Sequence, residues 1–390
     1  MIGPLTETLR IIKEIIRFNR LSLKERAVVF YAENRNSWVH FEPIILSLLE
    51  KHQQIICYVT SSSEDPILTK PLQGITPFFI GEGYLRNWFF HTLKASCLVM
   101  TMPDLETYFI KRSSMHTVHY LYVHHSMVST HVIYRKGAFD SFDTIFCVGP
   151  HHFDEIRATE KFYNLKKKHL LKHGYGHLDS ILVKRKKKNL EERKCDRINI
   201  LVAPSWGTQA LLETCGIKLI ETLLKQNYGV FVRPHPETLK KSKSLIQDIV
   251  YRFSSYSNFK IEMDITSEES FFQSDFMVSD WSGVALEYAF GFERPVLFID
   301  VPRKINNPSY KDIPSKPLED FIRKEIGQIV SLEDIDQIGG IIKHFQMQKD
   351  IYVKRIRQAR NKWVYNLGQS GQVGSNFIHK LISNLNSKNH

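Results

Sequence analysis

The chain has 390 residues, of which 43% are hydrophobic and 24% are charged, a composition typical of a globular protein with more than one core. No apolar run approaches the roughly 20 residues of a membrane-spanning helix, and the first residues lack a secretory leader pattern, so we expect a cytoplasmic protein. The formal net charge of +12 indicates anionic partners such as nucleic acid, lipid headgroups or phosphorylated substrates. Because no zinc-finger, RNA-recognition or basic-zipper pattern is present, we expect no nucleic-acid partner.

Residues 5–20 predict a basic amphipathic helix. Leu9, Ile12, Ile15 and Ile16 fall on one helical face, and arginines and a lysine surround them. Two roles remain open for this helix. It lies on an anionic membrane surface, or it packs on its own domain with a solvated basic edge.

Two series of alternating strands and helices follow. Strand-like runs in the first half indicate a Rossmann-like domain over residues 1–182, and those in the second half indicate another over residues 197–335. The highly charged residues 183–196 are predicted as a linker, and residues 336–390 as helices that pack back across both domains. The predicted fold class is therefore α/β, with two Rossmann-like domains in a GT-B-type arrangement and a ligand cleft between them. The strand-like runs are 27–31, 54–60, 75–80, 97–101, 118–123 and 143–148, then 198–204, 229–234, 259–263, 276–280 and 295–300.

The most informative stretch is 275–300, which predicts a strand, a polar turn, a helix and a second strand. The turn contains Ser279, Asp280, Ser282 and Gly283, and its hydroxyl and backbone N–H groups suit an anionic phosphate at a helix N-terminus. Glu287 follows about one helical turn later, where a carboxylate can accept hydrogen bonds from a ribose. The alternative is that Ser279 or Asp280 only caps the helix.

Two further turns close strands of the same predicted sheet. Arg233 and His235 lie between prolines that fix the exit from a strand, and they suit a diphosphate, although a loop histidine beside a surface arginine is the simpler alternative. Ser205, Trp206 and Thr208 occupy the turn after residues 198–204. Because the carboxyl ends of parallel strands share one edge, the three turns together predict a nucleotide-diphosphate site.

Five segments of the chain form a recognisable set: APSW (203–206), RPHPE (233–237), SDWSGVALEYA (279–289), RPVLF (294–298) and GYGHLDSIL (174–182). With them the sequence resembles the CDP-glycerol glycerophosphotransferase family of teichoic acid and capsule-type polymer synthesis. The resemblance implies a GT-B fold that needs no metal or other cofactor. It also implies a CDP-activated donor held by the C-terminal domain and a hydroxyl acceptor, on a glycan or a lipid-linked chain, approached from the N-terminal domain.

The family's functional residues carry over at several positions. The resemblance implies that His235, Ser279 and Ser282 hold the pyrophosphate and that Arg233 supports it. His125 is similar to the family's catalytic histidine, whose neutral imidazole takes the proton of the acceptor hydroxyl. His124 and His131 remain nearby alternatives for the base.

The chain departs from the family pattern on the acceptor side. Where the family carries an aspartate that orients the base, this chain offers Glu33, His40 and Glu42, and we predict Glu33 for that role. The family's His-Gly-Thr is His-Ser-Met here, so the acceptor, and with it the transferred group, is open. Residues 149–156 contain two adjacent histidines followed by acidic residues, which we interpret as a helix N-terminus in preference to a metal site.

The leading hypothesis is a transferase on the inner face of the cell membrane. It moves glycerol phosphate, or a related polyol phosphate, from a CDP donor to a hydroxyl of a glycan or lipid-linked acceptor and releases CMP. The first alternative is a GT-B glycosyltransferase that uses a CMP- or UDP-sugar, because fold alone does not set the donor. The second is a non-catalytic protein whose basic surface binds glycans or nucleic acid.

Overall fold

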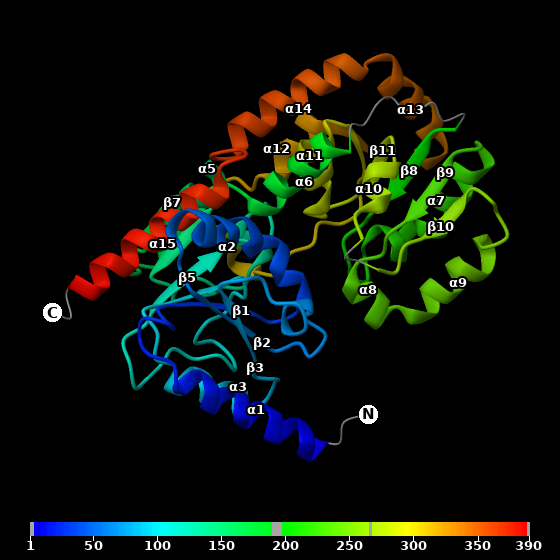
Figure 1. Ribbon diagram of the computed structural model, residues 1–390. Helices are drawn as coiled ribbons and strands as arrows, with labels where there is room; N and C mark the ends of the chain where they lie inside the picture. The colour runs from blue at the N-terminus through cyan, green and yellow to red at the C-terminus, as the bar shows by residue number, and fades with distance from the viewer. Residues whose placement is uncertain (1–3, 189–196, 265–266, 388–390) are drawn as a thin grey trace.

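The computed structural model describes residues 4–188, 197–264 and 267–387. It contains two α/β domains, each built on one parallel sheet, with helices running between them (Figure 1). In both sheets most strands that are consecutive in the chain also pair with each other. Because every pair is parallel, each connection crosses back over the sheet. The fold class predicted from the sequence is confirmed.

The N-terminal sheet has the strand order β3-β2-β1-β4-β5-β6-β7, with every pair parallel. Strands β1, β2, β4 and β6 are buried along their whole length, as expected when helices cover both faces of a sheet. The strands are β1 (Val28–Ala32), β2 (Ile56–Thr60), β3 (Ile75–Phe79), β4 (Cys97–Met100), β5 (His119–Val123), β6 (Thr144–Cys147) and β7 (His169–Lys172).

Two separate cores lie on the two faces of this sheet. One contains side chains of helices α1 and α3, and the other contains side chains of α2 and of the C-terminal helix α15. The helices of this half are α1 (Pro4–Asn19), α2 (Trp38–His52), α3 (Tyr84–Thr92), α4 (Thr130–Ile133), α5 (Pro150–Phe162) and α6 (Gly176–Lys187).

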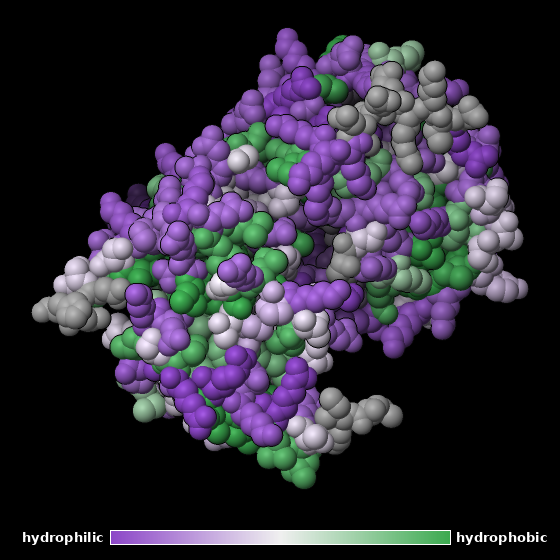
Figure 2. Space-filling model, in the orientation of Figure 1, coloured by the Kyte–Doolittle hydropathy of each residue, from purple (hydrophilic) through white to green (hydrophobic). Residues whose placement is uncertain are grey.

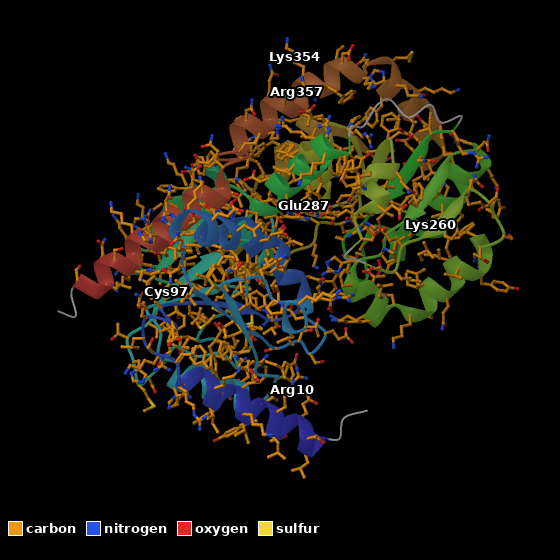
Figure 3. The ribbon with its side chains drawn as sticks, in the orientation of Figure 1. Arg10, Cys97, Lys260, Glu287, Lys354 and Arg357 are labelled. Atoms are coloured by element: carbon orange, nitrogen blue, oxygen red, sulfur yellow. The ribbon has the colours of Figure 1, made fainter. Side chains whose placement is uncertain are left out.

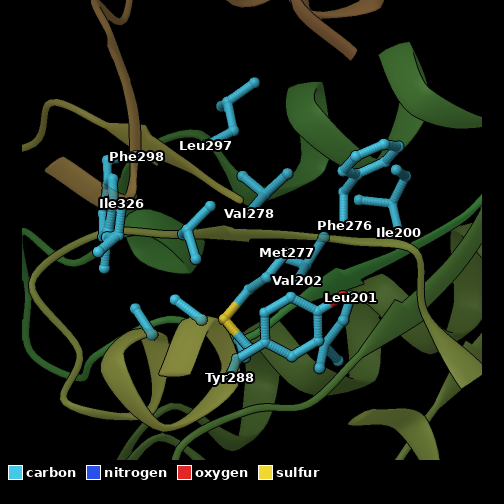
Figure 4. Packing of buried hydrophobic residues seen from close by; sticks show 14 of the residues in the cluster. Ile200, Leu201, Val202, Phe276, Met277, Val278, Tyr288, Leu297, Phe298 and Ile326 are labelled. Atoms are coloured by element: carbon cyan, nitrogen blue, oxygen red, sulfur yellow. The ribbon is translucent and has the colours of Figure 1, made fainter. Parts of the chain in front are cut away.

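The C-terminal sheet has the order β10-β9-β8-β11-β12-β13, again all parallel. Its central strands β8 and β11 supply Val202, Met277 and Val278 to one large core (Figure 4). The strands are β8 (Asn199–Val202), β9 (Gly229–Val232), β10 (Phe259–Ile261), β11 (Phe276–Ser279), β12 (Val296–Ile299) and β13 (Gly327–Val330). The helices are α7 (Leu211–Lys225), α8 (Pro236–Lys241), α9 (Lys243–Phe253), α10 (Glu269–Gln273), α11 (Val284–Phe292), α12 (Glu319–Ile326) and α13 (Ile338–Met347).

The last two helices connect the domains. Helix α14 (Lys349–Trp363) packs against α11 and α12, and α15 (Ser370–Ser387) packs along α2 of the N-terminal domain (Figure 1). Gly174 lies where this crossing segment passes, at a φ of +102°, and a Cβ there would stand 2.4 Å from the carbonyl oxygen of Tyr365. The close approach and the left-handed backbone both favour glycine at this position.

The predicted linker needs a correction. Helix α6 continues to Lys187, so residues 183–187 are helical and not part of a connector. The helix places its apolar residues against α2 and α11, which explains why it extends from one domain toward the other. Residues 189–196 lie outside the described residues.

Only part of the apolar face predicted for helix α1 is buried. Ile15 is buried against the domain together with Ile11 and Phe18. Leu9, Ile12 and Ile16, by contrast, remain 51%, 37% and 46% exposed. Among the described residues, none of the helices is both long enough and apolar enough to span a membrane.

Candidate active site

A cavity of about 650 Å³ lies between the two domains, at the carboxyl ends of both sheets. The N-terminal domain contributes the loops after β1 and β2 and His125 after β5. The C-terminal domain contributes loops after β8 and β9 and the start of α11. Figure 2 shows the surface hollowed between the two lobes, and Figure 3 places Glu287 between them.

His125 lines this cavity and is held in one tautomer. Its Nδ1 lies 2.9 Å from the carbonyl oxygen of Thr101, which only accepts, so Nδ1 carries the proton and Nε2 carries the lone pair. The hydroxyl of Tyr134 lies 3.4 Å from Nε2, which is long for an O–H···N bond and leaves the lone pair available. Burial lowers the pKa of His125, while the Thr101 carbonyl and Glu287 oppose that shift. The ring is therefore neutral near pH 7 and suited to accept a proton.

The two alternative bases point elsewhere. His124 is buried, with its ring centroid 3.9 Å from that of His152, and it is absent from the cavity wall. His131 lies 3.5 Å from Glu155 and bonds to the carbonyl oxygen of Ser315 at 3.1 Å. Neither ring reaches the cavity, so the geometry favours His125.

Glu33 does not orient His125. Within the described part of the chain no hydrogen bond or ion pair joins these two residues, and Glu33 does not line the cavity. Residue 33 is exposed, and burial of its carboxyl group raises the pKa of Glu33 while the charge of Arg86 opposes that shift. The backbone carbonyl of Thr101 fixes the tautomer instead, a role that side-chain motifs in a sequence do not reveal.

His40 and His177 complete the wall around His125. The ring centroid of His40 lies 6.2 Å from that of His125 and 5.6 Å from that of His177. Burial lowers the pKa of His177, but Glu287 and Glu268 outweigh it and raise that pKa to about 9. The Nε2 of His177 lies 3.3 Å from Glu268, and its Nδ1 lies 3.6 Å from Glu287. The segment GYGHLDSIL contains this histidine, but no pattern in that segment assigns it a role.

Tyr175 contacts both halves of the site. Its hydroxyl lies 2.7 Å from the Oε1 of Glu287 and 3.0 Å from the carbonyl oxygen of His125. Glu287 lines the cavity and is held from behind by Tyr175 and His177, so one of its oxygens is already engaged.

Arg233 and His235 both line the cavity from the C-terminal side. The Nη1 of Arg233 donates to Glu262 at 2.9 Å, and its guanidinium lies 4.8 Å from the ring centroid of Phe271. The Nδ1 of His235 accepts from the backbone N–H of Glu237 at 3.1 Å, which leaves its Nε2–H free to donate. Burial first, and the charge of Lys304 second, lower the pKa of His235 to about 4, so the ring is neutral.

Three residues predicted to contact the donor do not line the cavity, and this corrects the prediction: Ser205, Ser279 and Asp280. They support the turns below it. Ser279 is fully buried and donates to the carbonyl oxygen of Ala203 at 2.7 Å. Asp280 is also fully buried, and it accepts from the backbone N–H and the hydroxyl of Ser205 at 2.7 and 2.9 Å. The same carboxylate accepts from the N–H of Leu211 at 3.0 Å, at the start of α7. Neither residue caps α11, whose N-cap is Gly283 without a side-chain cap hydrogen bond, so the capping alternative is wrong as well. Ser279 and Asp280 instead bond to the turn after β8 and to the start of α7.

The remaining predicted residues divide by position. Ser282 lines the cavity, and Gly283 lies at the N-terminus of α11, where a Cβ would come within 2.5 Å of the Ser126 hydroxyl of the other domain. Thr208 is exposed and outside the cavity wall. Trp206 is also outside the wall, with its ring centroid 6.0 Å from that of His235.

The adjacent histidines of α5 support the segment after β5 that carries His125, residues 124–134, which we call the base-carrying loop. The Nε2 of His151 lies 2.8 Å from the carbonyl oxygen of Met127, and the Nε2 of His152 lies 2.9 Å from that of Val128. Within residues 4–188, 197–264 and 267–387, no group of three or more His, Cys, Asp or Glu side chains is arranged to hold a metal ion.

The two parallel sheets, the interdomain cavity and the crossing helices define a GT-B-type enzyme. A structure of the wall teichoic acid polymerase TagF, from a crystal soaked with CDPG, aligns with a TM-score of 0.55 at 16% identity, over 97% of this chain and 98% of that one. The S. aureus MnaA–UDP structure aligns with a TM-score of 0.58 at 12% identity, over 92% and 96%. The UDP-GlcNAc 2-epimerase of Methanocaldococcus jannaschii with UDP-GlcNAc and UDP aligns with a TM-score of 0.54 at 13% identity, over 91% and 99%. At these identities the likeness concerns the fold.

The family is shown by the sequence itself. Residues 15–365 match the family described as CDP-Glycerol:Poly(glycerophosphate) glycerophosphotransferase. The chain belongs to this family and is a CDP-glycerol glycerophosphotransferase-like enzyme, as the motifs predicted. No curated protein matches the chain in a direct sequence comparison.

Proposed function

We propose that this enzyme transfers glycerol phosphate, or a related polyol phosphate, from a CDP-activated donor to a hydroxyl of a glycan or lipid-linked acceptor. The reaction serves the synthesis of teichoic acid or capsule polymers and releases CMP. One observation carries the proposal: His125 from one domain and Arg233 and His235 from the other line a single cavity. The family match supports glycerophosphate transfer as the reaction that these residues would catalyse.

His125 acts as the general base. The acceptor hydroxyl gives its proton to the Nε2 of His125, and its oxygen forms a bond to the β-phosphorus of the donor. The bond between that phosphorus and the oxygen bridging to the α-phosphate breaks, so CMP leaves with the bond electrons. The Nδ1–H donated to Thr101 holds the ring in position and stabilises the imidazolium that forms.

The C-terminal wall stabilises the negative charge of the diphosphate. Arg233 supplies a permanent positive charge, and the Nε2–H of His235 donates a hydrogen bond. Ser282 adds a hydroxyl at the start of α11, and the free oxygen of Glu287 accepts from the ribose. These protein groups perform the charge stabilisation in our proposal, which therefore includes no metal ion or other cofactor.

The reaction itself is the test. The enzyme is incubated with CDP-glycerol and a lipid-linked glycan extract, and the products are followed by mass spectrometry. We expect CMP to appear in step with an acceptor that has gained one or more glycerol phosphate units. Stable CDP-glycerol in the presence of a broad set of acceptors would contradict the proposal.

A nucleotide-sugar donor is the second candidate, favoured by the fold shared with proteins solved with UDP ligands. A thermal-shift series with CDP-glycerol, CDP-ribitol, CMP-sugars and UDP-sugars separates the two candidates, because a bound donor raises the melting temperature by mass action. We expect the CDP-polyols to give the largest shifts. A larger shift with a UDP-sugar would favour the second candidate.

We further propose that the enzyme works at the inner face of the cell membrane, with α1 on the lipid surface. Leu5, Leu9, Ile12 and Ile16 follow helical spacing and are all exposed. Arg10 projects from the same helix (Figure 3), and the lower end of the molecule in Figure 2 shows hydrophobic and hydrophilic residues side by side. Such a face binds anionic lipid headgroups and the acyl boundary together.

Vesicle flotation tests this placement. Vesicles with anionic lipid should carry the protein, neutral vesicles should carry it less, and a Leu9→Ser/Ile16→Ser variant should remain unbound. Equal flotation of wild type and variant would rule out α1 as the contact.

A further inference from the structure

The segment after β12 runs from the donor side of the cavity to the loop that carries His125. The backbone N–H of Asn306 donates to the carbonyl oxygen of Val132 at 3.1 Å. The side-chain amide of Asn307 donates to that of His131 at 2.8 Å. Farther along, Glu319 accepts from the N–H and the hydroxyl of Ser129 at 2.8 and 2.7 Å. Residues 306–319 are thus held at both ends by the base-carrying loop and by α4 within it.

Lys304 lies at the start of this segment, two residues before the first of these hydrogen bonds. Its Nζ stands 3.4 Å from the ring centroid of Trp206, whose ring lies next to His235. A second ammonium, that of Lys241, lies 4.2 Å from the same ring, but it also pairs with Glu237 at 2.9 Å. Lys304 has no comparable partner: no carboxylate lies within ion-pair distance of its Nζ in the part of the chain that the structure describes.

The environment of Lys304 is unfavourable for an isolated cation. Its side chain is half-buried, and burial lowers its pKa to about 8, an effect that Asp280 opposes and Lys241 reinforces. An ammonium removed from water without a counter-ion costs free energy, which a bound anion would recover. The ring of Trp206 relates Lys304 to His235, since the Lys304 Nζ lies 3.4 Å from its centroid and the centroid of the His235 ring lies 6.0 Å from it. The charge of Lys304 also lowers the pKa of His235.

Lys304 is not part of the cavity wall, but it shares the ring of Trp206 with His235, which is. We propose that Lys304 is a ligand of the donor's diphosphate, acting beside His235. The nucleoside diphosphate supplies the anion that the ammonium lacks, and the hydrogen bonds of Asn306 and Asn307 hold the lysine backbone in place for it. This inference rests on the proposed function, since it names a contact of the same donor. No motif in the sequence marked Lys304, because a single lysine in a loop after a strand carries no pattern.

Isothermal titration with CDP and with cytidine tests the contact, because the two probes differ only in the diphosphate. We expect Lys304→Met to weaken CDP binding by about tenfold or more, with cytidine affinity changed less than about twofold. Lys304→Arg should restore CDP affinity to within about threefold of wild type, because the charge is retained. The matched control is Lys311→Met, which removes an exposed lysine of the same segment and should leave CDP binding within about twofold.

The pH dependence of CDP binding gives a second measurement. The phosphates of CDP are fully ionised well above a pKa of about 6, so the probe does not titrate between pH 7.5 and 9.5. The groups that face Lys304 are Asp280, Glu237, Lys241 and His235, and all are retained in Lys304→Met. CDP affinity of the wild type should therefore fall as the pH rises and Lys304 loses its proton, and this fall should be smaller in Lys304→Met.

The outcomes separate this inference from the proposed function. Equal CDP affinity in wild type and Lys304→Met, with the variant's melting temperature unchanged, would overturn the contact while the enzyme still turns over CDP-glycerol. A selective loss of CDP affinity that spares cytidine cannot arise from misfolding, because both probes need the folded site. A wild type that binds no CDP and leaves CDP-glycerol intact would overturn the proposed function itself.

Discussion

The two walls of the cavity are built in different ways. On the donor side, Arg233, His235 and Ser282 come from short loops after parallel strands of one domain. His235 is held by the neighbouring Glu237, and Arg233 is held by Glu262 of the same domain. On the acceptor side, the Thr101 carbonyl positions the ring of His125, and Tyr175 joins its backbone to Glu287 of the opposite domain. The donor wall is therefore built within one domain, whereas the position of the base depends on both.

A second difference lies within the donor loops. His235 and Ser282 reach the cavity, but Ser205, Ser279 and Asp280 satisfy one another and the backbone beneath it. Hydroxyl-rich turns thus contain residues that face the ligand and residues that shape the turn. Substitution of the residues that face the ligand should change catalysis. Substitution of the residues that shape the turn should change the free energy of unfolding.

Removing the base should give the largest effect. His125→Ala should lower kcat by about 10³-fold, within the range for loss of a general base, while CDP-glycerol affinity changes little. The exposed His379→Ala serves as a control and should retain full activity. Steady-state kinetics and isothermal titration measure the two quantities. A His125→Ala enzyme with near-normal kcat would exclude this residue as the base.

In contrast to His125→Ala, His235→Ala should affect donor affinity more than kcat. It removes a hydrogen bond to a charged phosphate, so donor binding should weaken by about 10- to 100-fold. Because the pKa of His235 is about 4, the loss should be the same at pH 6 and pH 8. Donor binding that weakens only at acid pH would show that a charged His235 is the functional form.

Asp280→Ala should act on stability. It removes the acceptor of two buried N–H groups and one hydroxyl, so the free energy of unfolding should fall by about 3 kcal/mol. Thr208→Ala, in the exposed part of the neighbouring turn, should change it by less than about 0.5 kcal/mol. Denaturant unfolding compares them. A stable Asp280→Ala protein that has lost donor affinity would restore the direct contact predicted from the sequence.

His177 should make stability depend on pH. Its pKa is about 9 in the folded protein, and about 6.5 is expected in the unfolded chain, so its ion pairs stabilise the fold fully below pH 6.5. This stabilisation is lost as the pH rises through 9. The melting temperature of wild type should exceed that of His177→Gln by several degrees at pH 6, and the gap should narrow by pH 9.5. A gap that is constant with pH would mean that His177 is neutral in the fold.

Glu33→Gln should have the smallest effect. Since Glu33 is exposed and away from the cavity, kcat should change by less than about twofold, as expected for a surface substitution. A loss of 100-fold in the same kinetic assay would return Glu33 to the role of orienting the base.

The sequence predicted the fold well because its signals are local. Eleven of the strands were predicted, most of them from mainly apolar runs of the kind that buried parallel strands require. The exception is β10, FKI, which is only partly buried. The edge strands β7 and β13 were missed, because HLLK and GQIV are short and partly polar. Helices α8 and α9 are separated at Ser242, a break that no proline or glycine signals in the sequence.

The site was predicted less completely, for a physical reason. Strand-end motifs identified Arg233, His235, Ser282 and Glu287, which all line the cavity. The motifs did not distinguish these cavity-lining residues from Ser205, Ser279 and Asp280, which are buried below the cavity. Burial of a serine hydroxyl depends on the packing of neighbouring strands, which a motif does not show. His177 lies in α6 and Lys304 lies in the loop after β12, and no motif assigns either of them a role. Their charges become meaningful only beside residues that are distant in sequence.

The central claim is that the two walls meet around one donor diphosphate. A crystal structure of His125→Ala, which should bind the donor without turning it over, in complex with CDP-glycerol tests this directly. We predict that the diphosphate lies within hydrogen-bond distance of Arg233, His235 and Ser282, with residue 125 facing the β-phosphorus. A donor bound outside this cavity, or with its β-phosphorus turned away from residue 125, would contradict the account.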